Sequence, residues 1–170
     1  MRIYIPTYKR VDSQITFENL PSDIQKNVIM VVQDQERKHY TYDCEYLVVG
    51  NEIGIAKTRE LIYHHAGTNH FGMMDDDLRF YRRNSKYYGE ESNMDTSKRL
   101  MTLEDWNDWF NRVETWFKED NIMHIGHRDM SLPPYGENHY FNKLFIATHW
   151  IDGSKLNKFV DEVDWNLGTY

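Results

Sequence analysis

Short apolar runs alternate with polar stretches along the first half of the chain. These runs are too short for helices and are typical of buried strands, and they lie at 3–5, 28–32, 46–49 and 71–74. Residues 51–66 have the pattern of a loop followed by a helix, and Gly67 is placed to end that helix. Strands alternating with helices predict an α/β fold, with a mostly parallel sheet flanked by helices in a single domain.

The second half carries one strong helical pattern. Large apolar residues recur there at three- and four-residue steps, namely Leu103, Trp106, Trp109, Phe110, Val113, Trp116 and Phe117. Thr102 precedes them with Asp105 three residues later, close to a capping box. The stripe predicts a helix that faces the core, with an exposed docking face as the alternative. Elsewhere we expect a surface loop at 84–101, strands at 122–125 and 143–150, a turn at 133–136 and a short amphipathic helix at 156–165.

The composition limits the class of protein. The 170 residues include 20 Lys and Arg against 27 Asp and Glu, a formal net charge of −7. No apolar run approaches the roughly 18 residues of a membrane helix, and the first residues have the character of a strand instead of a secretory leader. A single cysteine, Cys44, excludes an internal disulfide. We therefore expect a cytoplasmic protein without a membrane partner, and the acidic balance argues against general coating of nucleic acid.

Three aspartates, Asp75, Asp76 and Asp77, directly follow the apolar run FGMM. Adjacent carboxylates repel one another, and a hard divalent cation such as Mg²⁺ or Mn²⁺ would offset that repulsion. In an extended chain residues 75 and 77 point to the same side, so this pair can share one metal ion. A solvated acidic turn is the alternative. The position after a buried strand favours a ligand site, because open α/β sheets bind ligands at the carboxyl ends of their strands.

Polar groups also follow the other strands. Residues 7–10 supply a hydroxyl, an aromatic face and two cations at the end of the first strand, and Asp34 follows the second. Such groups suit a base, a ribose and a diphosphate. Lys57 and Arg59 lie near the start of the next helix, whose N-terminus favours an anion. For these two cations an ordinary solvated helix face is the alternative.

Taken in this order, the segments resemble the glycosyltransferases of GT-A fold, especially the family-2-like enzymes. Pro6-Thr7-Tyr8-Lys9-Arg10 is similar to the segment that ends their first strand, and Asp34 to the aspartate that contacts the nucleotide base. Gly54 to Arg59 is similar to their Gly-x-x-x-Ala-Arg-Asn-like helix start, and Asp75 with Asp77 matches their Asp-x-Asp motif. The resemblance covers residues 1–80, which would form the nucleotide-sugar-binding half, with residues 81–170 as the acceptor half.

The resemblance implies a metal-dependent hexosyl- or pentosyltransferase with a GT-A-like, Rossmann-like fold. The donor would be a nucleotide sugar, with a UDP-sugar expected, and Mn²⁺ or Mg²⁺ would bridge its diphosphate. We expect the donor to be bound by Thr7, Tyr8, Arg10, Asp34, Lys57, Arg59, Asp75 and Asp76. The expected metal ligands are Asp75, Asp77 and His149, although a lone His in an apolar strand is more often a satisfied core residue.

A carboxylate near a late helix often serves such enzymes as the base that accepts the proton of the acceptor hydroxyl. The segment FVDEVDW is similar in character, so Asp161, Glu162 and Asp164 are the candidates. The charged face of a terminal helix is the alternative. Many members of this fold continue well past this length, so a minimal acceptor side, or one completed by a second subunit of an oligomer, is expected.

The acceptor is the least determined part of this hypothesis. Residues 79–88 interleave Arg and Lys with Phe and Tyr, a composition that suits stacked bases with phosphates, sugars, or simple counter-charge. Some compact GT-A-like enzymes of phages and kinetoplastids glycosylate hydroxymethylated pyrimidines in DNA, which makes DNA a candidate acceptor beside glycans, proteins and lipid-linked sugars.

Two other classes compete with a glycosyltransferase. A nucleotidyltransferase would need a glycine-rich loop after the first strand, and residues 6–13 contain no glycine. A non-catalytic sugar- or nucleic-acid-binding module would have no need of the three aspartates.

Overall fold

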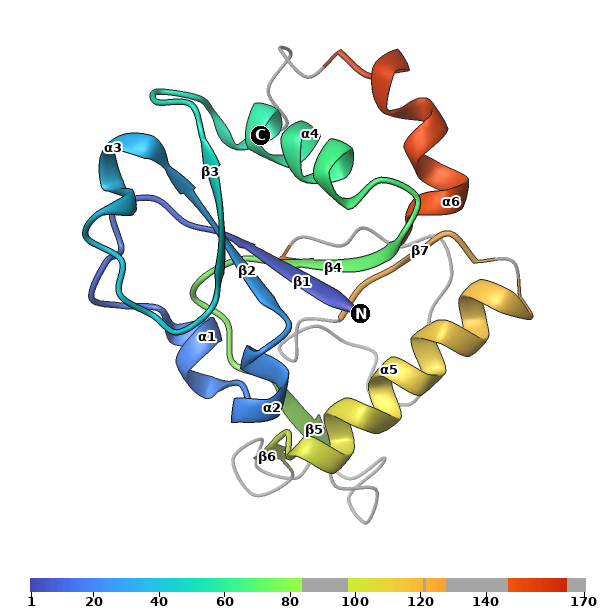
Figure 1. The fold of residues 1–170 in the computed structure, drawn as a ribbon. Coiled ribbons are helices and arrows are strands. Elements are labelled where there is room, and N and C mark those ends of the chain that lie inside the picture. The colour runs from blue at the N-terminus through green and yellow to red at the C-terminus, as the bar shows by residue number, and fades with distance from the viewer. Residues whose placement is uncertain (84–97, 121, 128–146, 165–170) are drawn as a thin grey trace.

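The computed structural model describes residues 1–83, 98–120, 122–127 and 147–164 (Figure 1). Within these residues the strands are β1 Arg2–Pro6, β2 Val28–Gln33, β3 Glu45–Val49, β4 His70–Met74, β5 Tyr81–Arg83, β6 Lys98–Leu100, β7 His124–Ile125 and β8 Thr148–Asp152. The helices are α1 Ile15–Asn19, α2 Ser22–Gln25, α3 Asp34–Arg37, α4 Ile55–Ala66, α5 Leu103–Lys118, α6 Gly153–Leu156 and the 3₁₀ helix η2 Asn157–Glu162.

One sheet organises the molecule, with the strand order β3-β2-β1-β4-β8-β7. The first four of these strands run parallel, whereas β8 is antiparallel to both β4 and β7. This confirms the mostly parallel α/β fold. The chain order reverses between β1 and β4, so the carboxyl ends of these two strands border the switch point at which such sheets bind ligands.

Helices cover both faces of the sheet, as the apolar runs require (Figure 1). Because side chains alternate along a strand, Ile3 and Ile5 of β1 face one core while Tyr4 faces the other. The first core includes residues of α1, α2 and α5, and the second includes Ile62 and Ala66 of α4. Gly67 ends α4 with a φ of 61°, as its position predicted.

The aromatic stripe of α5 faces the core, which confirms the core interpretation. Trp106, Val113 and Phe117 are buried, while Trp109 is partly buried beside them. A complete capping box starts the helix, with Thr102 and Asp105 exchanging hydrogen bonds. Tertiary packing and local capping therefore agree for this element.

Several boundaries in the second half differ from the prediction. Within the expected loop, Lys98–Leu100 forms strand β6, which pairs with β5. The strand expected at 122–125 is shorter and comprises only His124–Ile125 of β7. Strand β8 begins at Thr148. The tail predicted as one helix is divided into α6 and η2. The expected turn at 133–136 lies outside the described residues.

The short helices α1, α2 and α3 were missed altogether. Each has only four or five residues, too few for a helical repeat to show in the sequence. Their formation depends on tertiary contacts, because isolated helices of this length are not stable.

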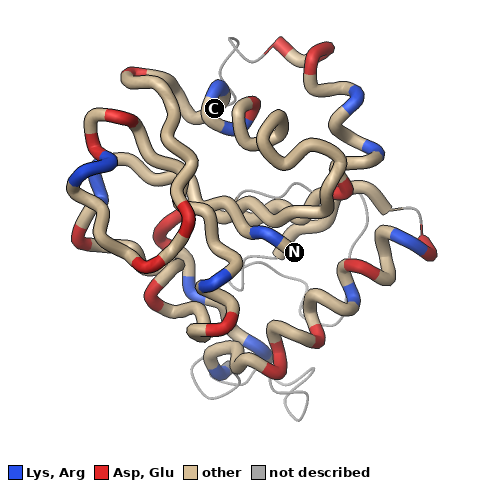
Figure 2. The backbone as a smooth tube through the Cα atoms, viewed as in Figure 1, with Lys and Arg blue, Asp and Glu red and all other residues tan. Residues whose placement is uncertain are grey.

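Charged residues of both signs are interspersed along the described chain (Figure 2). Within that part of the chain, no helix has both the length and the apolar character needed to cross a membrane.

Candidate functional site

The site lies where β1 and β4 end side by side. Beyond β1 the Thr7 amide still donates to Val31 of β2 at 3.0 Å, and beyond β4 the Asp75 amide donates to the Ala147 carbonyl at 3.0 Å. These backbone bonds extend the sheet by one residue on each strand. The β1 end and the three aspartates are thereby fixed next to each other.

The middle aspartate of the triplet is buried. Asp76 is only 8% exposed, and its Oδ2 accepts a 2.7 Å hydrogen bond from the Thr7 hydroxyl. The Gln14 amide nitrogen donates to the same Thr7 hydroxyl at 2.7 Å and to the Arg10 carbonyl at 2.8 Å. A buried polar chain therefore joins the β1–α1 loop to the carboxylate after β4.

The two outer aspartates lie closer to solvent and each faces an arginine. Asp75 lies 3.8 Å from Arg59, and Asp77 lies 3.2 Å from Arg10, which also approaches Asp76 at 3.4 Å. Burial raises the pKa of Asp75, Arg59 opposes that rise, and the charges of Asp77 and Asp76 add to it. An additional cation at this position would therefore stabilise the ionised form of Asp75.

The loop after β1 is held against α3. The Lys9 amide donates to both carboxylate oxygens of Glu36, at 3.1 and 3.2 Å, and Lys9 adopts a φ of 56°. A pocket of about 540 Å³ opens there, lined by Lys9, Arg10, Val11, Asp12, Ser13 and Glu36. Tyr8 beside it is 47% exposed. The Lys9 ammonium lies over the Tyr8 ring, 4.8 Å from its centroid, and Arg10 connects the polar pocket to Asp77.

The predicted donor residues divide into two groups. Five of them, together with the predicted metal ligand Asp77, take part in hydrogen bonds or ion pairs at this edge of the sheet, namely Thr7, Arg10, Arg59, Asp75 and Asp76. Asp34 is exposed at the start of α3, on the same edge. Lys57 instead pairs with Glu60 at 2.5 Å, as expected of a solvated helix face.

His149 lies within β8, opposite Met73 of β4. Its Nδ1 is 2.8 Å from Nε2 of His124, and the two rings stack with centroids 5.0 Å apart. Within the described residues, no group of three or more His, Cys, Asp and Glu side chains is arranged to hold a metal ion. The joint role of Asp75, Asp77 and His149 as metal ligands therefore stays a prediction.

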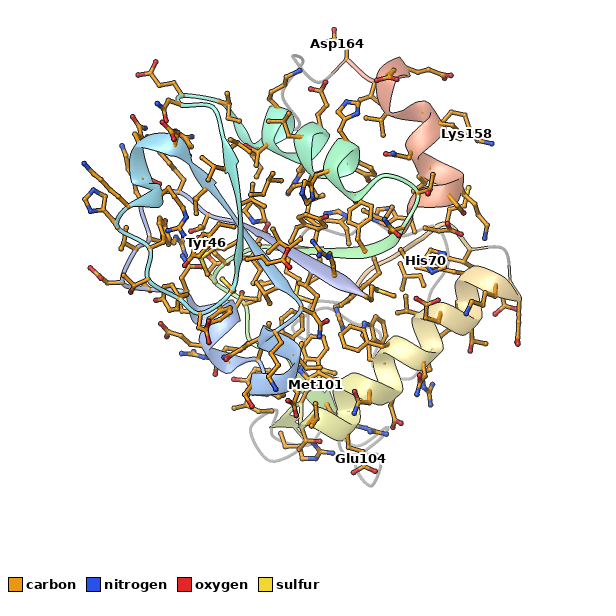
Figure 3. All side chains as sticks on the ribbon, in the orientation of Figure 1. Tyr46, His70, Met101, Glu104, Lys158 and Asp164 are labelled. Carbon is orange, nitrogen blue, oxygen red and sulfur yellow. The ribbon has the colours of Figure 1, made fainter. Side chains whose placement is uncertain are left out.

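The three carboxylates proposed as the base lie around η2. Asp161 is 88% exposed on its side chain and lies 3.8 Å from His64, in the last turn of α4. A helix that follows a parallel strand ends at the opposite edge of the sheet from the strand's carboxyl end, so this is the far side from Asp75. Glu162 is exposed nearby, and Asp164 lies at the outer end of this segment (Figure 3). Their role as base remains a prediction that this placement does not favour.

Residues 79–88, which interleave cations with aromatic side chains, contribute one arginine to contacts within the fold. Arg82 and Arg99, from β5 and β6, both donate to the buried Asp105 at the start of α5. The Arg99 hydrogen bond, followed by those from Thr102 and Arg82, holds the pKa of Asp105 well below its usual range despite burial. Arg82 therefore anchors a hairpin to α5. Arg79 is exposed, and the rest of the segment from residue 84 on lies outside the described residues.

Sequence reasoning missed the polar residues that hold the site. Gln14 and Thr16 are both fully buried, and Thr16 donates to the Asp75 carbonyl at 2.6 Å. Glu36 accepts a hydrogen bond from the Lys9 amide of the β1–α1 loop, and the Tyr40 hydroxyl accepts one from the Arg10 amide. No motif marked any of them, because the partners of Thr16, Glu36 and Tyr40 are far away in the sequence and those of Gln14 lie in a loop without a regular pattern.

The mostly parallel sheet flanked by helices has the arrangement of a Rossmann-like GT-A fold, and carboxylates and arginines lie at its switch point. The chain belongs to the family of TET-associated glycosyltransferases, whose family model matches residues 1–169. It is therefore a glycosyltransferase, as the resemblance of residues 1–80 indicated. Searches of curated proteins and of solved structures found no significant match.

Proposed function

We propose that the protein transfers a sugar from a nucleotide sugar, a UDP-sugar in the first instance, to the hydroxyl of a hydroxymethylated base in DNA, with Mn²⁺ or Mg²⁺ as cofactor. One observation carries the proposal: Asp75 and Asp77 face Arg59 and Arg10 at the switch point of the sheet. Negative groups for a metal and positive groups for phosphates are thus within one site.

The aspartates present fit a divalent cation. Mg²⁺ in phosphate-transfer and related sites is usually held by one or two carboxylates together with substrate phosphates, without a full protein cage. Asp75 and Asp77 have side chains that are 39% and 47% exposed, so both can reach a ligand in solvent. When bound, the ion would link the donor diphosphate to the protein and stabilise charge on the leaving nucleotide.

The remaining groups suit the donor. Arg59 and the N-terminus of α4 provide positive charge for the diphosphate. The exposed ring of Tyr8 offers a stacking face, and the pocket beside Glu36 has room for a nucleoside. We assign Asp34, exposed on the same edge, to the nucleotide base.

In the proposed reaction the acceptor hydroxyl oxygen forms a bond to the anomeric carbon of the sugar. The bond between that carbon and the diphosphate oxygen breaks, and its electron pair leaves with the nucleoside diphosphate. The hydroxyl proton passes to a base. Arg10 and Arg59 stabilise the negative charge that develops on the diphosphate.

The family supports DNA as the source of the acceptor hydroxyl. The exposed Arg79, directly after the aspartates, provides a positive group for a phosphate of the DNA backbone. The net charge of −7 makes broad, non-specific binding to DNA unfavourable, so we expect contact to be local and to depend on salt.

The donor half of the proposal is tested by calorimetric titration of UDP, and separately of GDP, with and without Mn²⁺. We expect one nucleotide to bind and its affinity to fall at least about tenfold without metal. Asp77→Asn should lose the metal dependence, whereas Asp23→Asn, an exposed acid paired with Lys26, should retain it. Equal affinity with and without metal would refute the cofactor, and the absence of binding would favour a non-catalytic module.

The acceptor half is tested with two oligonucleotides that differ only in one hydroxymethyl group on a pyrimidine. After incubation with UDP-sugars and Mn²⁺, mass spectrometry should show the mass of one added sugar on the hydroxymethylated strand alone. Sugar on both strands, or on neither while a glycan or protein acceptor is modified, would refute the DNA assignment.

A further inference from the structure

We propose that Asp76, unlike its two neighbours, is a positioning residue, held by Thr7 and Gln14 so that Asp75 and Asp77 keep a fixed geometry. This rests on the proposed function of the same site. It departs from the expectation that Asp76 binds the donor, because the geometry assigns the three adjacent aspartates two different tasks.

Exposure separates the middle carboxylate from the outer two. The Asp76 side chain is 12% exposed, against 39% for Asp75 and 47% for Asp77. The buried oxygen of Asp76 already accepts the Thr7 hydroxyl at 2.7 Å, and its other oxygen faces Arg10. A ligand would have to displace these internal partners to reach it.

The hydrogen bonds run in one direction. The Thr7 hydroxyl has a single proton, and it can give that proton to Asp76 because the Gln14 amide donates to the same oxygen. The Gln14 amide nitrogen donates to the Arg10 carbonyl at 2.8 Å. Exchanging the positions of its nitrogen and oxygen would put two acceptor oxygens face to face, so the orientation of this amide is fixed. Gln14, fully buried, thus sets the direction of the whole chain.

The backbone of the triplet is fixed as well. The Thr16 hydroxyl donates to the Asp75 carbonyl at 2.6 Å and accepts from the Leu78 amide at 2.8 Å, while the Thr16 amide donates to the Asp76 carbonyl at 3.0 Å. The main chain on both sides of Asp76 is held and its carboxylate is anchored inward, so the backbone that carries the Asp75 and Asp77 side chains is fixed. A metal site made by only two carboxylates needs this kind of preorganisation.

The first test needs no ligand. A double-mutant cycle in urea unfolding combines Thr7→Val with Asp76→Ala, and we expect coupling of about tenfold in the unfolding constant. Asp23→Asn combined with Thr7→Val is the matched control and should be additive. Additivity of the Thr7 and Asp76 changes would overturn the proposed link.

The second test compares Mn²⁺-dependent UDP affinity among folded variants. Asp76→Asn keeps an acceptor for Thr7, so it should lose about threefold, while Asp76→Ala should lose about tenfold or more. Thr7→Val should resemble Asp76→Ala, and Thr7→Ser should restore affinity. If Asp76→Asn loses metal dependence as fully as Asp77→Asn, then Asp76 is a ligand and the proposal is wrong.

The two tests fail separately. If the unchanged protein binds no nucleotide with Mn²⁺, the proposed donor site fails, and the unfolding cycle still decides whether Thr7 and Asp76 form the link. If Asp76→Ala does not fold, the cycle is run with Asp76→Asn, for which smaller but measurable coupling is expected, and additivity again refutes the link.

Discussion

Replacing Asp105 by Asn should destabilise the protein in a way that depends on pH. Asp105 is 4% exposed and accepts from the Thr102 amide and hydroxyl, both at 2.9 Å, while Arg82 and Arg99 donate to it from the β5–β6 hairpin. Asn keeps the shape but loses the charge. One of its two polar atoms becomes an amide donor that must face an arginine or Thr102.

The expected loss follows from the contacts. Losing a helix N-terminal cap interaction costs about 1 kcal/mol. The side chains of Arg82 and Arg99 are 49% and 54% exposed, so solvent screens both pairs, and the Arg82 pair contributes at most about 1 kcal/mol. We therefore expect Asp105→Asn to lower the free energy of unfolding by about 2 kcal/mol at pH 7.

The pH dependence has a definite sign. The pKa of Asp105 is lower in the folded protein than the usual value of about 3.9, so its contribution is fully present above that value and is lost as pH falls below it. Urea unfolding of both proteins at pH 7 and pH 3 should show a smaller difference at pH 3. Asp108→Asn, an exposed change on the same helix, should have little effect. A difference that is equal at the two pH values would refute the assignment.

Three further outcomes are expected. Asp77→Asn should abolish metal-dependent UDP binding in calorimetry without lowering the melting temperature, because it relieves repulsion among the aspartates; unchanged affinity would contradict this. Trp106→Ala, at 1% exposure, should cost about 3–5 kcal/mol in urea unfolding, and Trp109→Ala clearly less, since Trp109 is only partly buried; the reverse order would be inconsistent with the observed burial. Gly72→Ala should cost about 1–3 kcal/mol, because its Cβ would lie 2.6 Å from the Trp150 ring; an unchanged melting temperature would show that the ring can move.

The sequence alone determined much of the first half of the fold. The runs at 28–32 and 71–74 are apolar on both faces because both faces of the sheet are covered. Such strands can be predicted without knowing how individual side chains pack. The carboxyl ends of parallel strands meet at one edge, and for that reason the grouping of Thr7, Arg10 and the three aspartates could be predicted. The stripe and capping box of α5 are local signals, and they also proved correct.

Only the tertiary structure decided how those groups divide their tasks. Asp75, Asp76 and Asp77 are identical in the sequence, and Asp76 differs because the hydroxyl of Thr7, more than sixty residues earlier, binds its carboxylate inside the fold, whereas Arg10 lies beside both Asp76 and Asp77. The same holds for Gln14, whose partners lie in a loop of no regular pattern. Periodicity reports which face of an element is buried. Periodicity does not predict which buried polar atoms form hydrogen bonds across the fold, because those contacts depend on how whole elements pack together.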